Sequence, residues 1–390
     1  MIINPYTPGA GLVPNYLAGR DDTIEEAKEF ISYVAHGYPT RSIVYYGLRG
    51  VGKTVLLNKI EDIAEENNVL YEHIEVSERS SFKIAISLHI QKLIKQMSVK
   101  EKAKSYVQKA MSVLKAFKIT YSPEGEVSIG LQEDVVAAVG VSDTGNFTND
   151  LTELFVSMGT LAKNSESSVC LFIDEIQYLK DNEFEALITA LHRVNQKGLP
   201  VTLFAAGLPK VTKIAGDIKS YAERLFRFIS IGSLEPEAAK LALVEPAKKI
   251  GVTFTAEAID EILRITEGYP YFLQEYGKQV WAFIKNENID ITSVREAYPS
   301  FEKSLDDSFF KVRYDRATPK EKEFMHAMVA CDGLPCTIAQ IAGKMNTSVQ
   351  SISPVRGQLI YKGFIYAPGY GEVDFTVPQF NQYLKRIHNS

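Results

Sequence analysis

Hydrophobic positions in the first 235 residues follow two spacings. Short runs of β-branched and aromatic residues predict buried strands, and stretches with apolar residues three or four positions apart predict helices between them. The predicted strands are residues 42–46, 69–76, 169–173, 201–207 and 228–231. Strands that alternate with helices are typical of a parallel α/β sheet, and we expect that fold class here.

Three helices are predicted before the middle of this region. They cover residues 23–36, with Asp22 or Thr23 as the N-cap, residues 55–64, and residues 81–97. Each has the apolar spacing of a helix that packs against a sheet.

Residues 99–167 interrupt this alternation, and we interpret them as an insertion between core elements. They contain a lysine-rich helical stretch up to Phe117, a predicted hairpin over residues 118–130, a loop, and a helix over residues 149–163. The lysines of the insertion either contact nucleic acid or form an ordinary solvated helix face. They are Lys100, Lys102, Lys104, Lys109, Lys115 and Lys118.

The strongest chemical signal is a glycine-rich loop between the first predicted strand and its helix. Glycines let backbone N–H groups turn toward phosphates, and the helix N-terminus adds partial positive charge. Lys53 would reach the β- and γ-phosphates, and the Thr54 hydroxyl would bind Mg²⁺. Strand, loop and helix in this order predict a nucleoside triphosphate site, with an ordinary glycine-rich turn as the alternative. The loop reads Gly47-Leu48-Arg49-Gly50-Val51-Gly52-Lys53-Thr54 and completes the pattern G-x-x-x-x-G-K-[ST].

Two adjacent carboxylates, Asp174 and Glu175, follow the apolar run 169–173. Ligand sites in parallel sheets lie at the carboxyl ends of strands, so we expect this pair beside the phosphate loop. Asp174 would hold Mg²⁺ through water, and Glu175 would polarise the water that attacks the γ-phosphate. The structural alternative makes Asp174 a helix N-cap and Glu175 a partner of the helix dipole.

Composition restricts the class of protein. The 390 residues are 45% hydrophobic, enough for two or three domains, and a net charge of −5 argues against coating nucleic acid through bulk charge. The sequence shows no targeting signal and no apolar segment of membrane-spanning length, so we expect a cytoplasmic protein. The three cysteines are too few for a disulfide framework, and Cys331, Cys336 and His326 would be an incomplete metal set.

Four ordered elements resemble an AAA+ ATPase of the origin-recognition-like branch, close to the STAND-type switch ATPases. They are Gly19-Arg20-Asp21, the glycine-rich loop (Walker A), Ile173-Asp174-Glu175 (Walker B) and Arg224 before the last strand. The resemblance covers about residues 12–380. It implies ATP or ADP and Mg²⁺ as ligands, a sheet in the order 5-1-4-3-2, and a small helical lid. The implied domains are a core over residues 1–235, the lid over 236–300, a linker over 301–317 and a C-terminal domain over 318–390.

The resemblance also implies roles for individual residues. Glu175 and Lys53 would be catalytic, with Arg224 as a finger toward a neighbouring subunit of a homo-oligomer and Arg227 as the fallback. An ordinary surface ion pair is the alternative for both arginines. Thr54 and Asp174 would bind the metal.

The resemblance also implies nucleotide contacts from two segments outside the glycine-rich loop, one before the first helix and one in the lid. The turn before the first helix would border the adenine, and Gly268-Tyr269-Pro270, similar to the Gly-x-Pro element of STAND proteins, would bring the lid against the base and ribose. The contacting positions would be Val13, Pro14, Gly19, Arg20, Gly47, Leu48, Arg49, Gly50, Val51, Gly52, Lys53, Thr54, Val55, Tyr269 and Pro270.

Two departures from the family pattern bear on function. The fourth strand runs into Leu208-Pro209, where many relatives place a polar residue that orients the hydrolytic water. The lid sequence Gly-Tyr-Pro-Tyr-Phe-Leu-Gln stands where many AAA+ motors have an arginine. A switch that holds nucleotide and hydrolyses it slowly fits this pattern better than a motor.

Residues 318–390 predict a winged helix-turn-helix. Thr318 and Pro319 open a helix to about Ala330, and short helices are expected over residues 337–344 and 353–362. Pro354 should break the second of these, which would restart with Ser353 as N-cap. Residues 363–366 and 372–376 flank a Pro-Gly-Tyr-Gly turn. Side chains that could reach DNA are Ser351, Ser353, Arg356 and Gln358.

The charge of this segment leaves its partner open. Seven basic residues (Lys320, Lys322, Lys344, Arg356, Lys362, Lys385, Arg386) stand against five acidic ones (Glu321, Glu323, Asp332, Glu372, Asp374), a net charge of +2. This is a small footprint for binding double-stranded DNA. The leading hypothesis is an ATP-hydrolysing switch that oligomerises and engages DNA or a partner protein. The alternative is a nucleotide-gated protein-interaction module without a DNA role, and a small-molecule phosphotransferase is a distant third.

Overall fold

The computed structural model describes residues 3–78, 80–98, 104–121, 136–219 and 222–388. The chain forms two compact units. The sheet unit consists of Arg20–Gly47 and Lys53–Ile231, and the helical unit consists of Met1–Gly19, Leu48–Gly52 and Gly232–Ser390. The boundary therefore crosses the glycine-rich loop, whose middle residues group with the helical unit.

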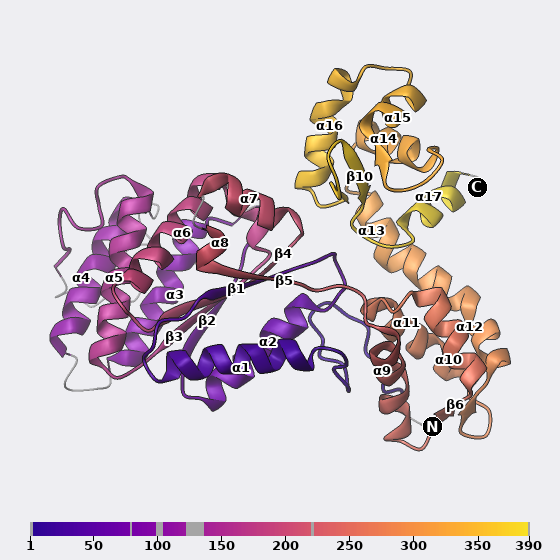
Figure 1. Ribbon diagram of the computed structural model, residues 1–390, viewed down its shortest axis with the longest axis horizontal. Coiled ribbons are helices and arrows are strands. Elements are labelled where there is room, and N and C mark those ends of the chain that lie inside the picture. Colours follow the sequence, from indigo (N-terminus) through magenta and orange to yellow (C-terminus); the bar gives the residue numbers. More distant parts are fainter. Residues whose placement is uncertain (1–2, 79, 99–103, 122–135, 220–221, 389–390) are drawn as a thin grey trace. The chain divides into compact units, whose positions relative to one another are not determined.

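A five-stranded parallel sheet forms the centre of the sheet unit (Figure 1). Its strands are β1 (Ser42–Tyr46), β2 (Leu70–Glu75), β3 (Val169–Asp174), β4 (Val201–Gly207) and β5 (Phe226–Ser230). Every neighbouring pair is parallel, and the order is β2-β3-β4-β1-β5. This is the predicted order 5-1-4-3-2 read from the other edge, so the fold class is confirmed. The carboxyl ends of all five strands meet at one edge.

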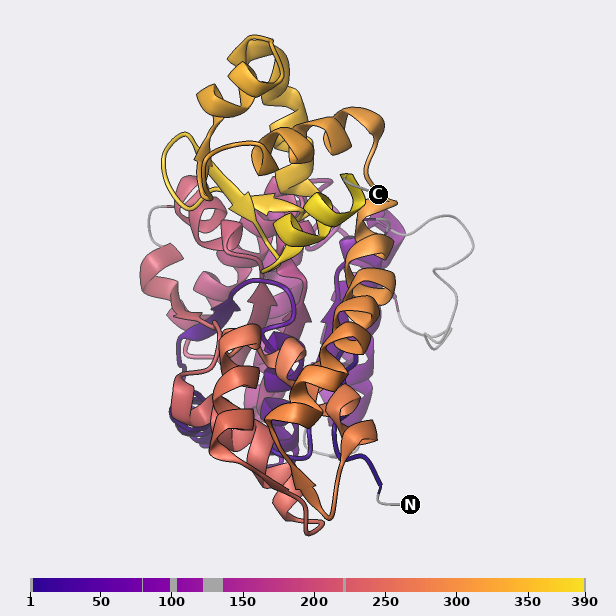
Figure 2. The ribbon, with the colours of Figure 1, turned by 90° about the vertical axis from the view of Figure 1, so that its right-hand side faces the viewer.

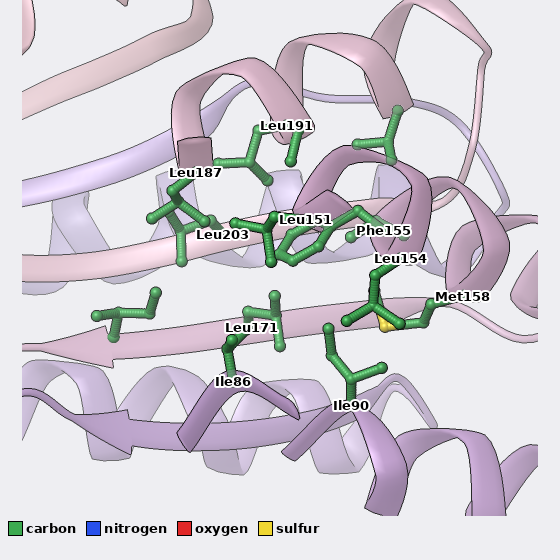
Figure 3. Packing of buried hydrophobic residues seen from close by; sticks show 14 of the residues in the cluster. Ile86, Ile90, Leu151, Leu154, Phe155, Met158, Leu171, Leu187, Leu191 and Leu203 are labelled. Carbon is green, nitrogen blue, oxygen red and sulfur yellow. The ribbon is translucent and has the colours of Figure 1, made fainter. Parts of the chain in front are cut away.

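Helices cover both faces of this sheet, because its central strands are buried on both sides. On β3, Val169, Leu171 and Ile173 enter a large apolar cluster shared with the helices of one face, several members of which Figure 3 shows. On the opposite face, Phe172 stacks on Phe204 of β4 at a centroid distance of 5.5 Å. Each fully buried side chain of this kind contributes about 1.5–3 kcal/mol. The helical segments of the unit are α1 (Asp21–Ala35), α2 (Lys53–Glu66), α3 (Phe82–Met97), α4 (Lys104–Tyr121), α5 (Phe147–Asn164), η2 (Ile176–Tyr178), α6 (Asp181–Gln196), α7 (Lys210–Ile218) and α8 (Ala222–Leu225).

The first helix begins earlier than predicted. Helix α1 starts at Asp21 with Arg20 as its N-cap, so the expected cap at Asp22 or Thr23 is wrong. Asp21 and Asp22 both lie in the first turn, where negative charge is stabilised by the helix dipole. The helix can therefore begin without the side-chain cap that the sequence seemed to offer.

The insertion differs from its prediction in two respects. Helix α4 continues to Tyr121, so the first residues of the predicted hairpin 118–130 are helical. Positions 122–130 of that hairpin lie outside the described residues, as do Lys100 and Lys102. Lys118 is buried, and its Nζ donates to Gln91 Oε1 at 2.6 Å, so it is not a surface for nucleic acid. Its spacing from Met111 and Leu114 places it on the apolar face of α4, which outweighs the charge of its head group.

The helical unit contains the predicted lid and the segment that follows it. Its lid elements are α9 (Pro236–Lys248), β6 (Thr253–Phe254), α10 (Ala256–Thr266), α11 (Pro270–Val280), η3 (Trp281–Phe283), β7 (Asn288–Ile289) and α12 (Ile291–Ser304). Helix α12 continues into η4 (Leu305–Phe310), a π-helical segment, and α13 (Lys311–Tyr314). Figure 2 shows this run as one long helical rod, in orange. The predicted connector is thus largely helical.

The C-terminal segment contains the three helices and two strands that the sequence predicted, with one correction, and two elements that it did not predict. The predicted elements are α14 (Pro319–Val329), α15 (Ile338–Lys344), α16 (Val349–Tyr361), β9 (Ile365–Tyr366) and β10 (Glu372–Phe375). The additional elements are β8 (Cys336–Thr337) and α17 (Phe380–His388). Strands β8, β10 and β9 form an antiparallel sheet. Helix α16 begins at Val349 and contains Pro354, so the break before Ser353 is wrong. Ser348 caps the helix by accepting from the Ser351 N–H, which stabilises the turn that precedes the proline.

Among the helices that the structure describes, none is long and apolar enough to cross a membrane.

Candidate functional site

The glycine-rich loop is anchored at the carboxyl edge of the sheet. The N–H of Gly47 donates to the backbone oxygen of Gly207, at the end of β4, at 3.1 Å. Lys53 is the first residue of α2, and its Nζ donates to the backbone oxygen of Gly47 at 3.0 Å. Gly50 and Gly52 have φ angles of +83° and +91°, a conformation that glycine adopts at no steric cost. The loop therefore requires its glycines, and Lys53 lies folded back along it.

Thr54 and Asp174 meet at the same edge. The Thr54 hydroxyl donates to Asp174 Oδ2 at 2.6 Å, and the N–H of Glu175 donates to Asp174 Oδ1 at 2.7 Å. Burial raises the pKa of Asp174, and the nearby Glu175 raises it further, while the hydrogen bond from Thr54 and the charge of Lys53 act in the opposite direction. A hydroxyl and a carboxylate side by side are the oxygen ligands that Mg²⁺ prefers, so this pair fits the predicted metal site.

Glu175 occupies an unusual backbone conformation. Its φ and ψ of 54° and 36° lie in the left-handed region, which non-glycine residues seldom adopt. Such strain is concentrated at functional sites in proteins. The structural alternative for Asp174 does not fit, because Asp174 accepts from Thr54 and from the next backbone N–H rather than capping a helix, whereas Glu175 does precede the short helix η2.

Gln177 is a site residue that the sequence prediction missed. It is buried, its Nε2 donates to Glu175 Oε2, and its Oε1 accepts from the N–H of Leu208 at 2.9 Å. The only signal in the sequence is its position two residues after Glu175. Its hydrogen bond with Leu208 joins the segment after β3 to the segment after β4, and a contact between such distant segments cannot be predicted from a local motif.

Two segments match known family models. Residues 16–204 match an AAA ATPase domain, and residues 307–384 match a domain of unknown function (DUF8462). The match over residues 16–204 and the sheet order together support an AAA+ P-loop fold for this part of the chain.

Solved structures support the same fold. The chain is similar to a Walker-type ATPase of Pyrococcus abyssi, with a TM-score of 0.55 and 13% identity over 95% of this chain and 96% of that one. Two weaker likenesses add nothing to the assignment. Orc1 of Aeropyrum pernix in complex with DNA has a TM-score of 0.46 at 15% identity, covering 96% of this chain and 94% of that one. The RuvB Holliday junction branch migration motor of Thermotoga maritima has a TM-score of 0.43 at 16% identity, covering 96% and 98%. No curated protein matches the sequence.

The middle of the Walker A loop contacts the predicted lid within the helical unit. The N–H of Tyr271 donates to the backbone oxygen of Gly50 at 3.3 Å. Tyr269 lies beside the same glycine, because a Cβ added to Gly50 would be 3.1 Å from its ring. The Tyr269 hydroxyl is buried and has no hydrogen-bond partner among the residues that the structure describes. Pro270 is the first residue of α11. The lid sequence expected to approach a nucleotide thus packs on the tip of the Walker A loop.

The remaining predicted nucleotide contacts precede the ATPase core elements. Val13 is exposed and Pro14 half-buried, in a segment without regular structure. Gly19 has a φ of +64°, and an added Cβ would lie 2.7 Å from Ala238 of α9. Arg20 precedes α1 in the sheet unit, and burial lowers its pKa. No nucleotide role follows from these placements alone.

The two candidate finger arginines of the ATPase lie near β5. Arg224 is exposed in the last turn of α8. Arg227 is exposed on β5, and its Nε donates to Glu26 Oε1 at 2.9 Å. Arg227 therefore forms the surface ion pair that was its alternative, while Arg224 keeps the exposure that a finger requires.

Proposed function

We propose that this chain binds ATP and hydrolyses it at the Walker A and Walker B residues. The observation that carries the proposal is the hydrogen-bonded pair of Thr54 and Asp174 next to Glu175, at the edge where Lys53 and the loop lie. Lys53 supplies a positive charge, Thr54 and Asp174 supply oxygen ligands for a metal ion, and Glu175 supplies a carboxylate base. Transfer of a phosphoryl group to water needs these three components.

Each residue of the site has a separate role in the proposed hydrolysis of ATP. Lys53 exchanges its hydrogen bond with Gly47 for the β- and γ-phosphates and places them along the loop. Thr54 and Asp174 would hold Mg²⁺, which would offset the negative charge of the phosphates. Glu175 accepts a proton from the water that attacks the γ-phosphate and so makes that water a better nucleophile. The products are ADP and phosphate.

A test of binding uses Lys53→Ala. The variant should lose most of its affinity for ATP, because Lys53 provides the charge that holds the phosphates. Val194→Ala, at a buried position in the last turns of α6, whose backbone oxygen accepts from the N–H of Leu199 before β4 begins, serves as a control for loss of stability. If Lys53→Ala bound ATP as tightly as the unsubstituted protein, the Walker A assignment would be wrong.

We further propose that hydrolysis operates a switch rather than a motor. A backbone hydrogen bond joins Tyr271 to the Walker A loop, and ring contacts connect Tyr271 to the C-terminal segment. The N–H of Tyr271 donates to Gly50, and its ring stacks on that of Phe309 with 4.4 Å between the ring centroids. The centroids of Phe309 and Phe310 are 5.5 Å apart, and those of Phe310 and Tyr383 are also 5.5 Å apart. A change at the loop that moves Tyr271 must also move the ring of Phe309, because side chains in a close-packed protein interior shift between discrete arrangements and do not deform continuously.

This switch predicts a specific loss. Phe309→Leu should leave ATP turnover within about twofold while weakening any nucleotide-dependent change in protease sensitivity of the C-terminal segment, since among the described residues only the ring contacts of Phe272 would still join Tyr271 to Phe310. Leu would keep the site apolar and so preserve folding. An unchanged protease response in this variant would refute the aromatic route.

Oligomerisation through Arg224 is a separate part of the proposal. An arginine finger acts on the phosphate held by a neighbouring subunit, so Glu175→Gln and Arg224→Ala subunits mixed together should recover part of the ATPase activity. Arg227→Ala subunits, which lose only a surface ion pair, should be active without mixing. Absence of recovery in the mixture would make Arg224 a structural residue.

We consider two partners for the C-terminal segment, double-stranded DNA and another protein. Within this segment, which we interpret as a winged helix, Ser351, Ser353 and Gln358 are exposed on α16, as direct contact with DNA requires.

One observation favours the alternative, a nucleotide-gated protein-interaction module. Lys362 pairs with the buried Glu321 at 2.9 Å, and Arg386 pairs with Asp306 and Glu302. These two basic side chains are therefore engaged within the chain, and fewer remain for phosphates.

A DNA titration at several salt concentrations separates the two. DNA engagement predicts affinity that falls steeply with salt in the presence of ATP. Absent binding, or binding without salt dependence, would favour the protein-interaction module.

A further inference from the structure

Gln177 uses both ends of its side-chain amide inside the sheet unit. It lies in η2, directly after Walker B, and only 3% of its surface is exposed. The amide nitrogen donates to Glu175 Oε2, and the amide oxygen accepts from the N–H of Leu208 at 2.9 Å. The side chain therefore connects the proposed catalytic base to the residue that follows β4.

The end of β4 is shaped to admit this side chain. Gly207 closes the strand, and a Cβ added there would lie 2.9 Å from Gln177 Oε1 and 2.9 Å from Ile176 Cγ2. Both distances are shorter than real Cβ contacts allow. A larger residue at position 207 would displace the amide, so the glycine and the glutamine fit each other.

The sequence shows Leu208-Pro209 where the resemblance leads one to expect a polar side chain after the fourth strand. In the structure a polar group does reach this place, but it comes from Gln177 on the neighbouring segment.

We propose that Gln177 is a positioning residue for Glu175, which holds the carboxylate in its orientation for water activation and ties that orientation to the end of β4. This inference rests on the proposed ATPase function. A neutral amide does not take up the proton of the attacking water, so Gln177 acts through Glu175 and not on the substrate.

Two features make such support necessary. Glu175 sits in a left-handed backbone conformation, which a non-glycine residue keeps only when its surroundings hold it there. Water activation also depends strongly on geometry, because a misplacement of about 1 Å can lower a rate by about 100-fold. The fixed backbone leaves the side-chain torsions of Glu175 free to rotate, and the hydrogen bond from Gln177 restricts them.

The test compares two substitutions at position 177. Gln177→Met has a similar size and removes both hydrogen bonds. Gln177→Glu keeps an oxygen that accepts from the Leu208 N–H but replaces the donor with a second carboxylate beside Glu175. Both should lower kcat by about 10- to 100-fold, since either loses the hold on Glu175. KM for ATP and the Kd of a non-hydrolysable ATP analogue should stay within about twofold of the values of the unsubstituted protein, because neither Gln177 nor Glu175 holds the phosphates.

Thr202→Val provides the matched control. Thr202 is buried near the amino end of β4, the strand whose carboxyl end lies beside Gln177, and it donates one hydrogen bond to the backbone oxygen of Arg41 at 3.3 Å. The control loses a buried polar contact without touching Glu175 and should keep its kcat. Adding Gln177→Met to Glu175→Gln should lower kcat no further, because positioning has no value once the base is gone.

Several results would overturn the inference. If Gln177→Met keeps full kcat while turnover still depends on Glu175, the ATPase stands and the positioning role is wrong. A loss of kcat in Gln177→Met that Thr202→Val matches, or that adds to the effect of Glu175→Gln, would indicate a merely structural role. If the unsubstituted protein shows no turnover dependent on Glu175, the proposed function fails and this inference fails with it.

Discussion

Replacing Gly268 with alanine would perturb the turn between α10 and α11 in two ways. Gly268 has a φ of +65°, which alanine adopts only with strain. An added Cβ would also lie 2.5 Å from the backbone oxygen of Leu234, whose N–H donates to the Gly268 oxygen at 2.9 Å. A backbone atom cannot rotate away as a side chain can, so the turn or residue 234 has to move.

The structure gives the size of each effect. The left-handed conformation costs about 1–2 kcal/mol for a residue with a Cβ. Relief of the close contact adds about 1–3 kcal/mol, the usual cost of overpacking, for a sum of about 2–5 kcal/mol. Gly251 supplies the matched control, since its φ is +81° but an added Cβ would meet no described atom within 4 Å. Gly251→Ala should therefore cost about 1–2 kcal/mol only.

Thermal unfolding without nucleotide measures the difference. At about 2–4 °C per kcal/mol for a cooperative unit of this size, the control should lose about 2–8 °C and Gly268→Ala several degrees more. The turn also carries Tyr269, which lies beside Gly50, so ATP affinity should fall in Gly268→Ala and not in the control. Equal midpoints and equal affinities for the two variants would refute the reasoning.

Two further predictions concern buried charges in the sheet unit. Burial raises the pKa of Asp174, so the folded protein binds the proton of this carboxyl more tightly than the unfolded chain does. The resulting stabilisation is present below the ordinary pKa of an aspartate and is lost as the pH rises through the raised pKa of Asp174. Asp174→Asn should then raise the unfolding midpoint at pH 7 while removing Mg²⁺-dependent hydrolysis, and a lower midpoint would contradict this. Lys118→Ala should destabilise the chain by about 2–5 kcal/mol in denaturant unfolding, as truncation of a core side chain does, without affecting any DNA affinity. Lys109→Ala, exposed on the same helix, should change stability by less than about 0.5 kcal/mol, and equal effects would argue against a buried Lys118.

The central strands β1, β3 and β4 could be predicted because they are buried on both faces. Their sequences are largely apolar runs, and the predicted bounds of β1 and β4 agree with the structure at both ends. Predictions failed where a local rule competed with packing. Pro354 does not end α16, because Ser348 stabilises the preceding turn. Lys118 does not face solvent, because its neighbours on the helix belong to the core.

The candidate site shows the same division. Thr54, Asp174 and Glu175 could be named from the sequence because motif spacing fixes their place at the carboxyl edge of a parallel sheet. Gln177 could not, because its role depends on Leu208, which follows β4 and lies 31 residues away in the sequence. The contact of Tyr271 with Gly50 joins residues even farther apart in sequence. Long-range hydrogen bonds of this kind have no local signature.

The most direct test of the account is the steady-state turnover of ATP by Glu175→Gln, measured beside its affinity for ATP. The substitution preserves the size of the side chain and removes its ability to accept a proton. If Glu175 is the base, kcat should fall by about 100-fold or more while the Kd for ATP stays within about twofold. Turnover equal to that of the unsubstituted protein would contradict the central claim that Walker A and Walker B of this chain form a hydrolytic site.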